Sequence, residues 1–308
     1  MKIFVTGGAG FVGRHVSEFL INEGHQVNIL DNISNSTKNN ISKLVKNGAS
    51  FVKGDITNYN TLLKSMSGLD FVIHLAARIS VQESVMKPEI TNLVNVTGTV
   101  NVLRSCVANK IPNVIAASSA AVYGKPDKMP LYENSPTNSI SPYGASKIAL
   151  EQYLKAFSNC YGINSIALRF FNIYGMGQSS AYAGVITKFM ERISANRPLV
   201  IFGDGKNTRD FVSIHDVVTA VSHAMKKIKG KKGAIYNIAS GRSSSINELA
   251  RMMISLSGKK LSVVHQRSKR GDVRHSVANI TLAKKDLGFV PKITLKDGIE
   301  DLMQKVNN

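Results

Sequence analysis

A tyrosine and a lysine four residues apart are the side chains of this sequence best placed for chemistry. Tyr143 and Lys147 lie in "SPYGASK" (141–147), at the start of a predicted helix with Ser141 as its cap and Pro142 in its first turn. Residues at this spacing share one face of a helix. An ammonium favours the ionised form of a neighbouring phenol, so the pair predicts a general base that removes a proton from a substrate hydroxyl.

Two serines end a strand-like run before this helix. Ser118 and Ser119 close "NVIAASS" (113–119), which has the length and composition of a strand. A serine hydroxyl at such a strand end can hydrogen-bond the same substrate oxygen or relay its proton. The sequence therefore predicts that a serine and the tyrosine act together at the carboxyl edge of a sheet.

A glycine-rich turn near the N-terminus predicts a dinucleotide site. "TGGAGFVG" (6–13) follows the first strand-like run and opens the first helix-like one. Two spacings of the fingerprint, G-x-x-G-x-x-G from Gly7 and G-x-G-x-x-G from Gly8, end at Gly13. Glycines at these points allow a tight turn, a close approach of the backbone to a pyrophosphate, and close packing of helix on strand.

An acidic residue after the second strand indicates which dinucleotide binds. Asp31 ends the run 26–31, 18 residues after Gly13. A carboxylate there accepts hydrogen bonds from both ribose hydroxyls and repels a 2′-phosphate, which favours NAD over NADP. Lys38 is near enough in sequence to weaken that preference. The nicotinamide and the lysine would then place two cations beside the tyrosine. Lowering a phenol pKa from ~10 to ~7 needs about 4 kcal/mol of such stabilisation.

Short β-branched runs alternate with helix-length segments through the first half of the chain. This alternation predicts an α/β fold with a doubly wound parallel sheet, whose ligands bind at the carboxyl ends of the strands. After residue 174 the rhythm breaks, so we expect a dinucleotide-binding domain at 1–174. Residues 175–308 would mainly form a smaller, partly interleaved substrate lobe, with some segments returning to the sheet. The expected strands are 2–7, 26–31, 50–55, 70–76, 113–119, 165–171 and 198–203, and the expected helices include 11–23, 90–109, 144–161 and 184–195.

The composition is that of a globular protein with an unusual charge. Of 308 residues, 39 are basic and 20 acidic, which leaves a net charge of +19. The late basic runs carry no interleaved aromatic residues, so they predict a solvated surface and not a nucleic-acid platform. Two cysteines without metal-like spacing predict reduced thiols and no metal site. No run reaches the ~18 apolar residues of a membrane span, and we expect a cytoplasmic protein that binds no membrane.

Further motifs occur in the order found in one large family. They are "HLAA" (74–77), "SAAVYG" (119–124), "PYGASK" (142–147), "LRFFNIYG" (168–175) and "IFGDGKNTRDFV" (201–212). With the glycine-rich turn, they make the chain resemble the extended short-chain dehydrogenase/reductases nearly from end to end. It looks most like their NAD-dependent nucleotide-sugar epimerase/dehydratase group, whose members keep a tightly held NAD on a Rossmann sheet.

The resemblance implies roles for particular residues. Ser119, Tyr143 and Lys147 would be the catalytic triad, with Lys147 also holding the nicotinamide ribose. The residues that would contact NAD are Gly7, Gly10, Phe11, Val12, Gly13, Asp31, Asn32, Asp55, Ile56, Leu75, Ala76, Asn95, Tyr143, Lys147 and Phe170. Those that would contact a UDP-sugar are Ser118, Ser119, Tyr143, Asn172, Val185, Phe202, Arg209, Lys269, Arg270 and Ser276.

Two alanines after the predicted catalytic serine bear on the reaction. Similar dehydratases use an Asp-Glu pair, and decarboxylases a Glu, in the two or three positions where this chain has Ala120 and Ala121. Alanine cannot move a proton, and Cys106 and Cys160 fall on predicted helices away from the site. The resemblance then implies redox inversion at C4. Tyr143 would take the C4 hydroxyl proton, hydride would pass to NAD+, and the keto sugar would turn before hydride returns to its other face.

The segment after "RSK" bears on the substrate. The family usually has arginine two residues before a late Gly-Asp, where this chain has Lys269 followed by Arg270, so either the diphosphate is held more loosely or Arg270 substitutes. In the family's 4-epimerases a tyrosine nearby excludes N-acetyl sugars, and that position here is Ser276. We therefore expect activity on UDP-GlcNAc and UDP-GalNAc as well as UDP-glucose and UDP-galactose, unless neighbouring loops fill the space.

Other readings stay open from the sequence. A UDP-glucuronate 4-epimerase would need a basic residue facing the C6 carboxylate, and other epimerases or dehydratases of the family share the same motifs. A non-catalytic NAD- or nucleic-acid-binding protein would have no need of an intact triad. The predicted helices 90–109 and 144–161 resemble the pair that forms the family's four-helix dimer interface, so we expect a homodimer.

Overall fold

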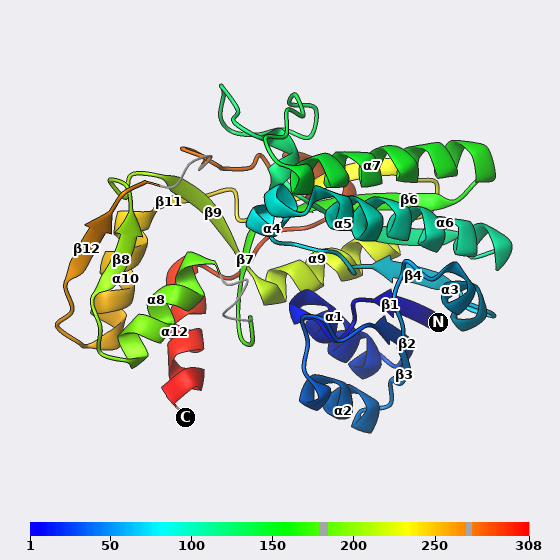
Figure 1. The fold of residues 1–308 in the computed structure, drawn as a ribbon, viewed down its shortest axis with the longest axis horizontal. Helices are drawn as coiled ribbons and strands as arrows, with labels where there is room; N and C mark the ends of the chain where they lie inside the picture. The colour runs from blue at the N-terminus through cyan, green and yellow to red at the C-terminus, as the bar shows by residue number, and fades with distance from the viewer. Residues whose placement is uncertain (179–183, 269–272, 308) are drawn as a thin grey trace.

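The central sheet has seven strands, and all of them run parallel. The computed structural model describes residues 1–178, 184–268 and 273–307 (Figure 1). Strands of the sheet lie in the order β10-β6-β5-β4-β1-β2-β3, and each neighbouring pair is parallel. They are β1 (Lys2–Thr6), β2 (Gln26–Asp31), β3 (Ser50–Lys53), β4 (Phe71–His74), β5 (Asn113–Ser119), β6 (Asn164–Phe170) and β10 (Lys232–Ile238).

Alternating side chains bury this sheet on both faces. Ile3 and Val5 pack on one face and Phe4 on the other, and all three are 0% exposed. Helices α1, α2, α9 and α11 cover the first face, and α3, α6 and α7 cover the second. A parallel sheet covered on both faces is the predicted doubly wound fold, which is confirmed. The helices are α1 (Phe11–Asn22), α2 (Lys38–Lys46), α3 (Tyr59–Ser65), α6 (Gly98–Ala108), α7 (Pro142–Tyr161), α9 (Ile214–Lys226) and α11 (Thr281–Leu287).

A smaller lobe lies beside the sheet domain, at the left of Figure 1. Its strands form a mixed three-stranded sheet and a parallel pair. Phe189, Leu249 and Ile299, from three different helices, are at most 1% exposed in its separate core. The elements are β7 (Asn172–Tyr174), α8 (Val185–Ser194), β8 (Leu199–Phe202), β9 (Thr208–Ser213), β11 (Ser243–Ser245), α10 (Ile246–Ser257), β12 (Val263–Gln266) and α12 (Leu295–Asn307).

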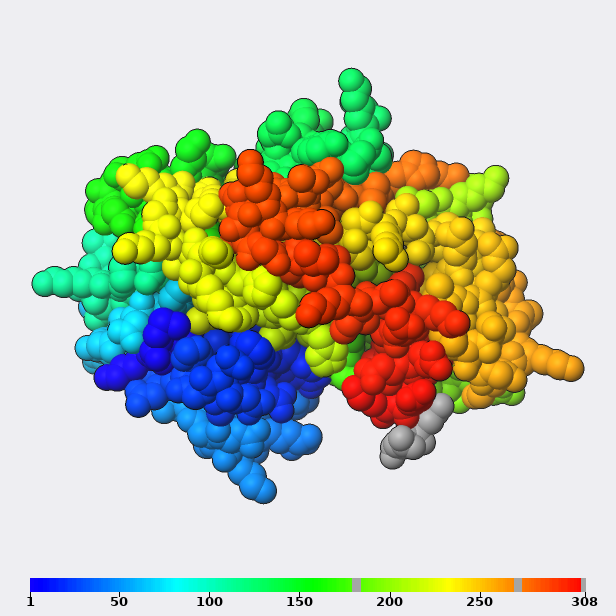
Figure 2. Space-filling model, turned by 180° about the vertical axis from the view of Figure 1, so that it is seen from behind, coloured from blue at the N-terminus to red at the C-terminus, as the bar shows by residue number. Residues whose placement is uncertain are grey.

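Segments after residue 174 also complete the large sheet domain. Strand β10 occupies the edge beside β6, and α9 and α11 pack over the sheet. Seen from behind, the orange-red segment around α11 lies between the yellow segment of α9 and β10 and the orange part of the smaller lobe (Figure 2). The two parts of the molecule are therefore interleaved along the chain.

The predicted helix 90–109 is helical from Pro88 to Ala108, with a π turn inside it. Two short helices, α4 (Val81–Met86) and α5 (Pro88–Asn92), precede a π-helical turn, η1 (Leu93–Thr97), and α6 then follows directly. A π turn carries one residue more than an α turn, and such turns are frequent at functional sites. Asn95 is the buried residue of this turn. Among the described helices, none is long and apolar enough to cross a membrane.

Candidate active site

The glycine-rich turn has the shape that a pyrophosphate requires. Gly7 has φ +68°, and a Cβ there would lie 2.7 Å from the Ala76 nitrogen. A Cβ on Gly13 would lie 2.0 Å from the Gly7 carbonyl oxygen. Helix α1 starts at Gly10 without a side-chain cap, which leaves its first N–H groups for an anion. Side chains at these positions would strike the protein's own backbone, so glycines are needed for the tight turn that brings backbone N–H groups close to a pyrophosphate.

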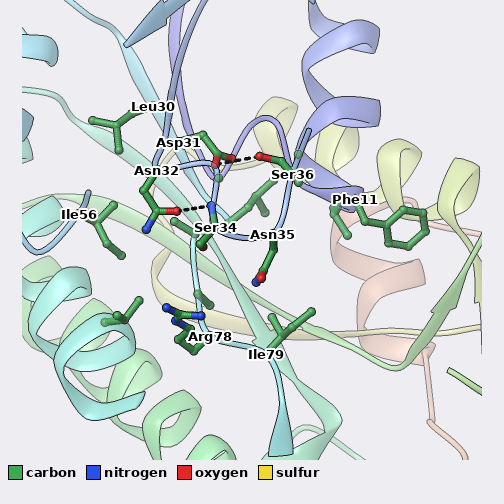
Figure 3. Close-up of a pocket in the computed structure, with 18 of the residues that line it drawn as sticks. Phe11, Leu30, Asp31, Asn32, Ser34, Asn35, Ser36, Ile56, Arg78 and Ile79 are labelled. Atoms are coloured by element: carbon green, nitrogen blue, oxygen red, sulfur yellow. Dashed lines mark hydrogen bonds between the residues drawn. The ribbon is translucent and has the colours of Figure 1, made fainter. Parts of the chain in front are cut away.

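A pocket at the carboxyl ends of β1, β2 and β4 collects most of the predicted NAD contacts (Figure 3). We call it the dinucleotide pocket. The predicted residues that line it are Gly7, Gly10, Phe11, Val12, Gly13, Asp31, Asn32, Asp55, Ile56, Leu75 and Ala76. The sequence analysis missed Ser34, Asn35, Ser36, Asn40, Arg78 and Gly177, which line it too. Most of them could have been found from their position, since they follow Asp31 or "HLAA" in the chain.

Two carboxylates are held in place at one end of this pocket. Asp31 accepts hydrogen bonds from the Ala9 nitrogen at 3.1 Å and the Ser36 hydroxyl at 3.2 Å, the second of which is visible in Figure 3. Asn32 donates to Asp55 at 2.7 Å. Burial raises the pKa of Asp55, but hydrogen bonds from Thr57 and Asn32 lower it further, so the pKa lies below its ordinary value. Asp55 therefore stays ionised at neutral pH, and a carboxylate at this end of the pocket would repel a 2′-phosphate.

Four predicted NAD contacts do not line this pocket, and two of them, Tyr143 and Lys147, are described with the triad below. Asn95 is 1% exposed and lies behind the pocket wall, where it bonds the Arg78 backbone at 2.7 and 2.9 Å and the Ser146 hydroxyl at 3.0 Å. It shapes the wall through Arg78. Phe170 is 8% exposed and lines the neighbouring cleft described below. Lys38 begins α2 and is exposed to solvent.

Ser119, Tyr143 and Lys147 come together where β5 ends and α7 begins. The Ser119 hydroxyl accepts a hydrogen bond from the Ala121 nitrogen at 3.2 Å, which starts a 3₁₀ turn, η2 (Ala120–Tyr123). The Ser119 side chain also hydrogen-bonds Tyr143. Lys147 donates from Nζ to the Ala117 carbonyl at 2.8 Å, and its Nζ lies 5.9 Å from the centre of the Tyr143 ring.

Burial changes the acidity of both titratable groups of the triad. Burial raises the pKa of Tyr143, and the hydrogen bond with Ser119 offsets part of that rise. Burial also lowers the pKa of Lys147 to about 8, against the opposing charge of Glu151. In the protein alone the pKa of the phenol therefore lies above its ordinary value, and its lowering by the lysine and the nicotinamide together stays a prediction. Any net lowering has to come from a further positive charge beside the phenol.

A second cavity, of about 630 Å³, opens beside the triad and is called the cleft here. That volume suits a small molecule. The predicted site residues that line it are Ser119, Tyr143, Phe170, Asn172, Val185, Phe202, Arg209 and Ser276, and they come from both parts of the molecule. Val81, Gln82 and Val85 of α4 also line it, and the Ser84 hydroxyl accepts a hydrogen bond from the Tyr143 nitrogen at 3.1 Å. Gln178 lines the cleft and the dinucleotide pocket, so the two adjoin.

Three predicted substrate contacts are not placed in the cleft. Ser118 is 3% exposed and donates its hydroxyl to Glu151 at 2.5 Å, so its side chain serves the framework below the triad and the predicted substrate contact is corrected. Lys269 and Arg270 lie outside the described residues. Among the described residues, no group of His, Cys, Asp or Glu side chains could hold a metal ion.

The sheet order, the glycine turn and the tyrosine-lysine pair define a class of NAD-dependent enzymes that act on a second ligand beside the dinucleotide. The family comparison is more specific. Residues 3–239 match the profile of the NAD dependent epimerase/dehydratase family, and the chain belongs to that family.

Relatives of known name are similar along the whole chain. A putative UDP-glucose 4-epimerase of Methanocaldococcus jannaschii is 38% identical over 309 residues, covering 99% of this chain and 98% of that protein. The structure of a UDP-glucose 4-epimerase with UDP-glucose from Thermotoga maritima gives a TM-score of 0.95 at 34% identity, covering 100% of this chain and 99% of that one. A UDP-N-acetylglucosamine 4-epimerase from Methanobrevibacter ruminantium gives 0.93 at 32% identity, covering 99% and 98%.

Proposed function

We propose that this NAD-dependent enzyme is a UDP-sugar 4-epimerase that interconverts UDP-glucose and UDP-galactose and also accepts UDP-GlcNAc and UDP-GalNAc. One observation carries the proposal. Tyr143 and Ser119 line the cleft next to the dinucleotide pocket, and the positions after Ser119 are Ala120 and Ala121, which line the cleft too. The site offers a base for C4 oxidation but no acid at the positions where the family's dehydratases carry one.

Each side chain of the triad has one task in this reaction. Bound NAD+ would accept the C4 hydride, return it to the other face, and add a positive charge beside the phenol. Tyr143 takes the C4 hydroxyl proton and gives it back, which a phenol can do when its pKa is brought toward neutrality. Ser119 hydrogen-bonds the same oxygen. The ammonium of Lys147 stabilises the ionised phenol, and its hydrogen bond to the Ala117 carbonyl holds it in place.

The charges of the cleft favour a neutral sugar over a uronic acid. The basic residues that line its described part are Arg209 and His275, both contributed by segments after residue 204. The residues from α4, the element that bonds the Tyr143 backbone, are Val81, Gln82 and Val85, which carry no charge. A C6 carboxylate near Tyr143 would find no cation among them, so UDP-glucuronate is the weaker candidate.

The small side chain of Ser276 supports acceptance of N-acetyl sugars. Ser276 lines the cleft, and its nitrogen donates to the Thr208 carbonyl at 3.2 Å, which ties the segment that carries it to β9. A side chain this small would leave room for an acetamido group at C2. Relatives with names of both kinds, UDP-glucose and UDP-N-acetylglucosamine 4-epimerases, are about equally similar to this chain.

Proton NMR of the purified protein with single UDP-sugars tests the proposal. With no cofactor added, UDP-glucose and UDP-GlcNAc should each form the product with an axial C4 hydroxyl, because the NAD that the protein retains is regenerated in every turnover. UDP-glucuronate should stay unchanged. A 4-keto-6-deoxy product, or release of CO₂ from the glucuronate, would contradict the proposal. Absence of any turnover, together with retention of nucleic acid at physiological salt, would favour the non-catalytic alternative.

We further propose that the protein is a homodimer through the outer face of α5, η1 and α7. Leu93, Tyr153 and Tyr161 are 50%, 38% and 59% exposed on these elements. Apolar and aromatic side chains at helical spacing are typical of an interface between helices. Light scattering should give twice the chain mass for the native protein and the single mass for Leu93→Asp. A native protein of single mass at micromolar concentration would contradict this proposal.

A further inference from the structure

A chain of buried polar groups lies directly below the triad. Glu151 and Arg169 are 3% and 2% exposed and form a two-point pair, with Nε–Oε1 and Nη2–Oε2 distances of 2.8 Å. Arg169 also donates to the Tyr123 hydroxyl at 2.8 Å. These groups join α7, β6 and η2, and the sequence motifs assigned none of them to the reaction.

Stability alone does not explain this pair. Removing a carboxylate and a guanidinium from water costs about as much as their attraction returns, and apolar side chains of the same volume often serve a core as well. Here Glu151 lies one helical turn after Lys147 on α7, and Arg169 faces Ser118 across the β5–β6 register. The pair therefore contacts both elements that carry the triad, because Glu151 lies on α7 and Arg169 lies beside β5.

Lys147 needs a negative charge nearby if it is to remain an ammonium. Its Nζ is buried against the Ala117 carbonyl, and a positive nicotinamide would discourage a second cation. The charged and titratable groups that face Lys147 are Tyr143 and Glu151 on its own helix and His74 from β4. Burial lowers the pKa of His74 to about 3, so it is neutral at any working pH. Of these three groups Glu151 is the carboxylate, and its two-point pair with Arg169 is that of an anion with a cation.

The same carboxylate holds the end of β5. Ser118 donates to Oε1 of Glu151 at 2.5 Å, and Ser119 is the next residue. This bond ties the last residues of β5 to α7, and it thereby fixes the backbone that carries Ser119. A displacement of about 1 Å at a reacting group can cost roughly a hundredfold in rate.

We propose that Glu151 is a positioning residue of this enzyme, which keeps Lys147 protonated and, through Ser118 and Arg169, fixes Ser119 opposite Tyr143. It touches neither pocket and acts through Lys147 and Ser119. The kinetic part of this proposal rests on the proposed epimerase activity, whereas the charge on Lys147 can be read without turnover.

The test follows the ionisation of Lys147 by NMR in the holoprotein labelled with ¹⁵N-lysine, with Lys147→Arg to identify the signal. Glu151→Gln keeps the side chain's shape and removes its charge, so the Lys147 midpoint should fall by about one pH unit. Glu151→Asp keeps the charge and should keep the midpoint. Glu133→Gln is the matched control, because Glu133 ends the same network, accepting from the Asn237 nitrogen at 2.8 Å. This variant should leave the midpoint unchanged.

The alkaline limb of the turnover profile should move with the Lys147 midpoint in Glu151→Gln. Its kcat should fall by about tenfold or more, with KM little changed because Glu151 does not reach the cleft. If Glu151→Gln does not fold because Arg169 is left unpaired, Glu151→Gln with Arg169→Gln removes both charges and carries the same expectation. A midpoint equal to that of Glu133→Gln, or an equal shift in Glu151→Asp, would overturn the proposal. A protein without epimerase activity would refute the proposed function and leave the NMR result standing.

Discussion

The dinucleotide pocket and the cleft adjoin, yet they are built in different ways. Most of the first is backbone and short side chains from residues 7 to 79, at the ends of consecutive strands. The second gathers side chains from residues 81 to 276, which come from both parts of the molecule. A pocket made of backbone is committed to one ligand shape, whereas a cleft made of side chains can change its ligand without refolding. The family can therefore keep NAD while its substrates vary.

The largest expected effect separates the chemistry of the cleft from binding in the pocket. Tyr143→Phe removes the base, so turnover should fall roughly a thousandfold. The NAD content should stay at the native level, because the pocket's backbone contacts are untouched. Turnover is measured by NMR and NAD by absorbance after denaturation. Tyr153→Phe on the same helix, 38% exposed, is the control and should be fully active. An active Tyr143→Phe enzyme would assign the base elsewhere.

The next change should break the pocket and leave the cleft intact. Gly7→Ala forces a Cβ to within 2.7 Å of the Ala76 nitrogen. NAD affinity should fall by more than tenfold, which is about 1.4 kcal/mol, while calorimetry should show unchanged binding of UDP. Gly24→Ala is the matched control, because Gly24 also has a positive φ, +78°, but nothing within 4 Å of its Cβ position. It should lose about 1 kcal/mol of stability and no NAD. Equal NAD loss in both variants would show that backbone strain alone is responsible.

A third change should alter the cleft's ligand and nothing else. Ser276→Tyr fills the space assigned to the acetamido group, so kcat/KM for UDP-GlcNAc relative to UDP-glucose should fall by about tenfold or more. Ser276→Ala should keep the native ratio. Both variants should retain NAD. If Ser276→Tyr slows both sugars equally, the residue does not select between them.

The smallest expected effect is a pH dependence that differs between the two regions. His74 bonds Thr6 at 2.8 Å and Thr99 at 3.0 Å beneath the dinucleotide pocket, and burial lowers its pKa to about 3. The unfolded chain therefore binds the extra proton between pH 6.5 and about 3. The free energy of unfolding should fall there by about 1.4 kcal/mol per pH unit as pH decreases. Urea unfolding at pH 6.5 and 5 should show this loss, and His74→Gln should reduce it.

The smaller lobe should respond to acid in the opposite sense. Burial raises the pKa of Asp210 to about 6, although the Ser240 hydroxyl donates to it at 2.6 Å. Protonated Asp210 therefore contributes to the free energy of unfolding at low pH, and this contribution is lost as pH rises through about 6. When the pH is lowered from 6.5 to 5, hydrogen-exchange protection, taken relative to the intrinsic exchange rate, should therefore fall more in β4 than in β9. An equal loss of protection in both strands would mean that neither His74 nor Asp210 sets the pH dependence of its region.

The dinucleotide pocket could be predicted from the sequence because its determinants are local. Gly7, Gly13 and Asp31 are fixed by turns and strand ends within 25 residues of each other, and the strands alternate as a buried sheet must. The family resemblance supplied the residues of the cleft, which come from distant segments. Patterns of sequence could not show that Ser118 faces Glu151 or that Asn95 lies behind Arg78, because both depend on which face of an element packs inward.

The π turn inside the predicted helix 90–109 illustrates the same limit. The apolar periodicity of this segment is that of a helix, and helical geometry persists from Pro88 to Ala108. The π turn around Asn95 depends on tertiary bonds to Arg78 and Ser146, which no local pattern encodes. The raised pKa of Tyr143 was missed for a related reason, since the sequence shows its cationic neighbour but not how dry the site is.

The place of β10 at the edge of the sheet has a consequence for how the chain is made. When only the first 174 residues have emerged from the ribosome, six of the seven strands are present, and the outer edge of β6 has no partner. A bare edge of this kind pairs readily with other chains. We expect a fragment of residues 1–174 to aggregate, and the newborn protein to depend on chaperones until residue 238 has emerged.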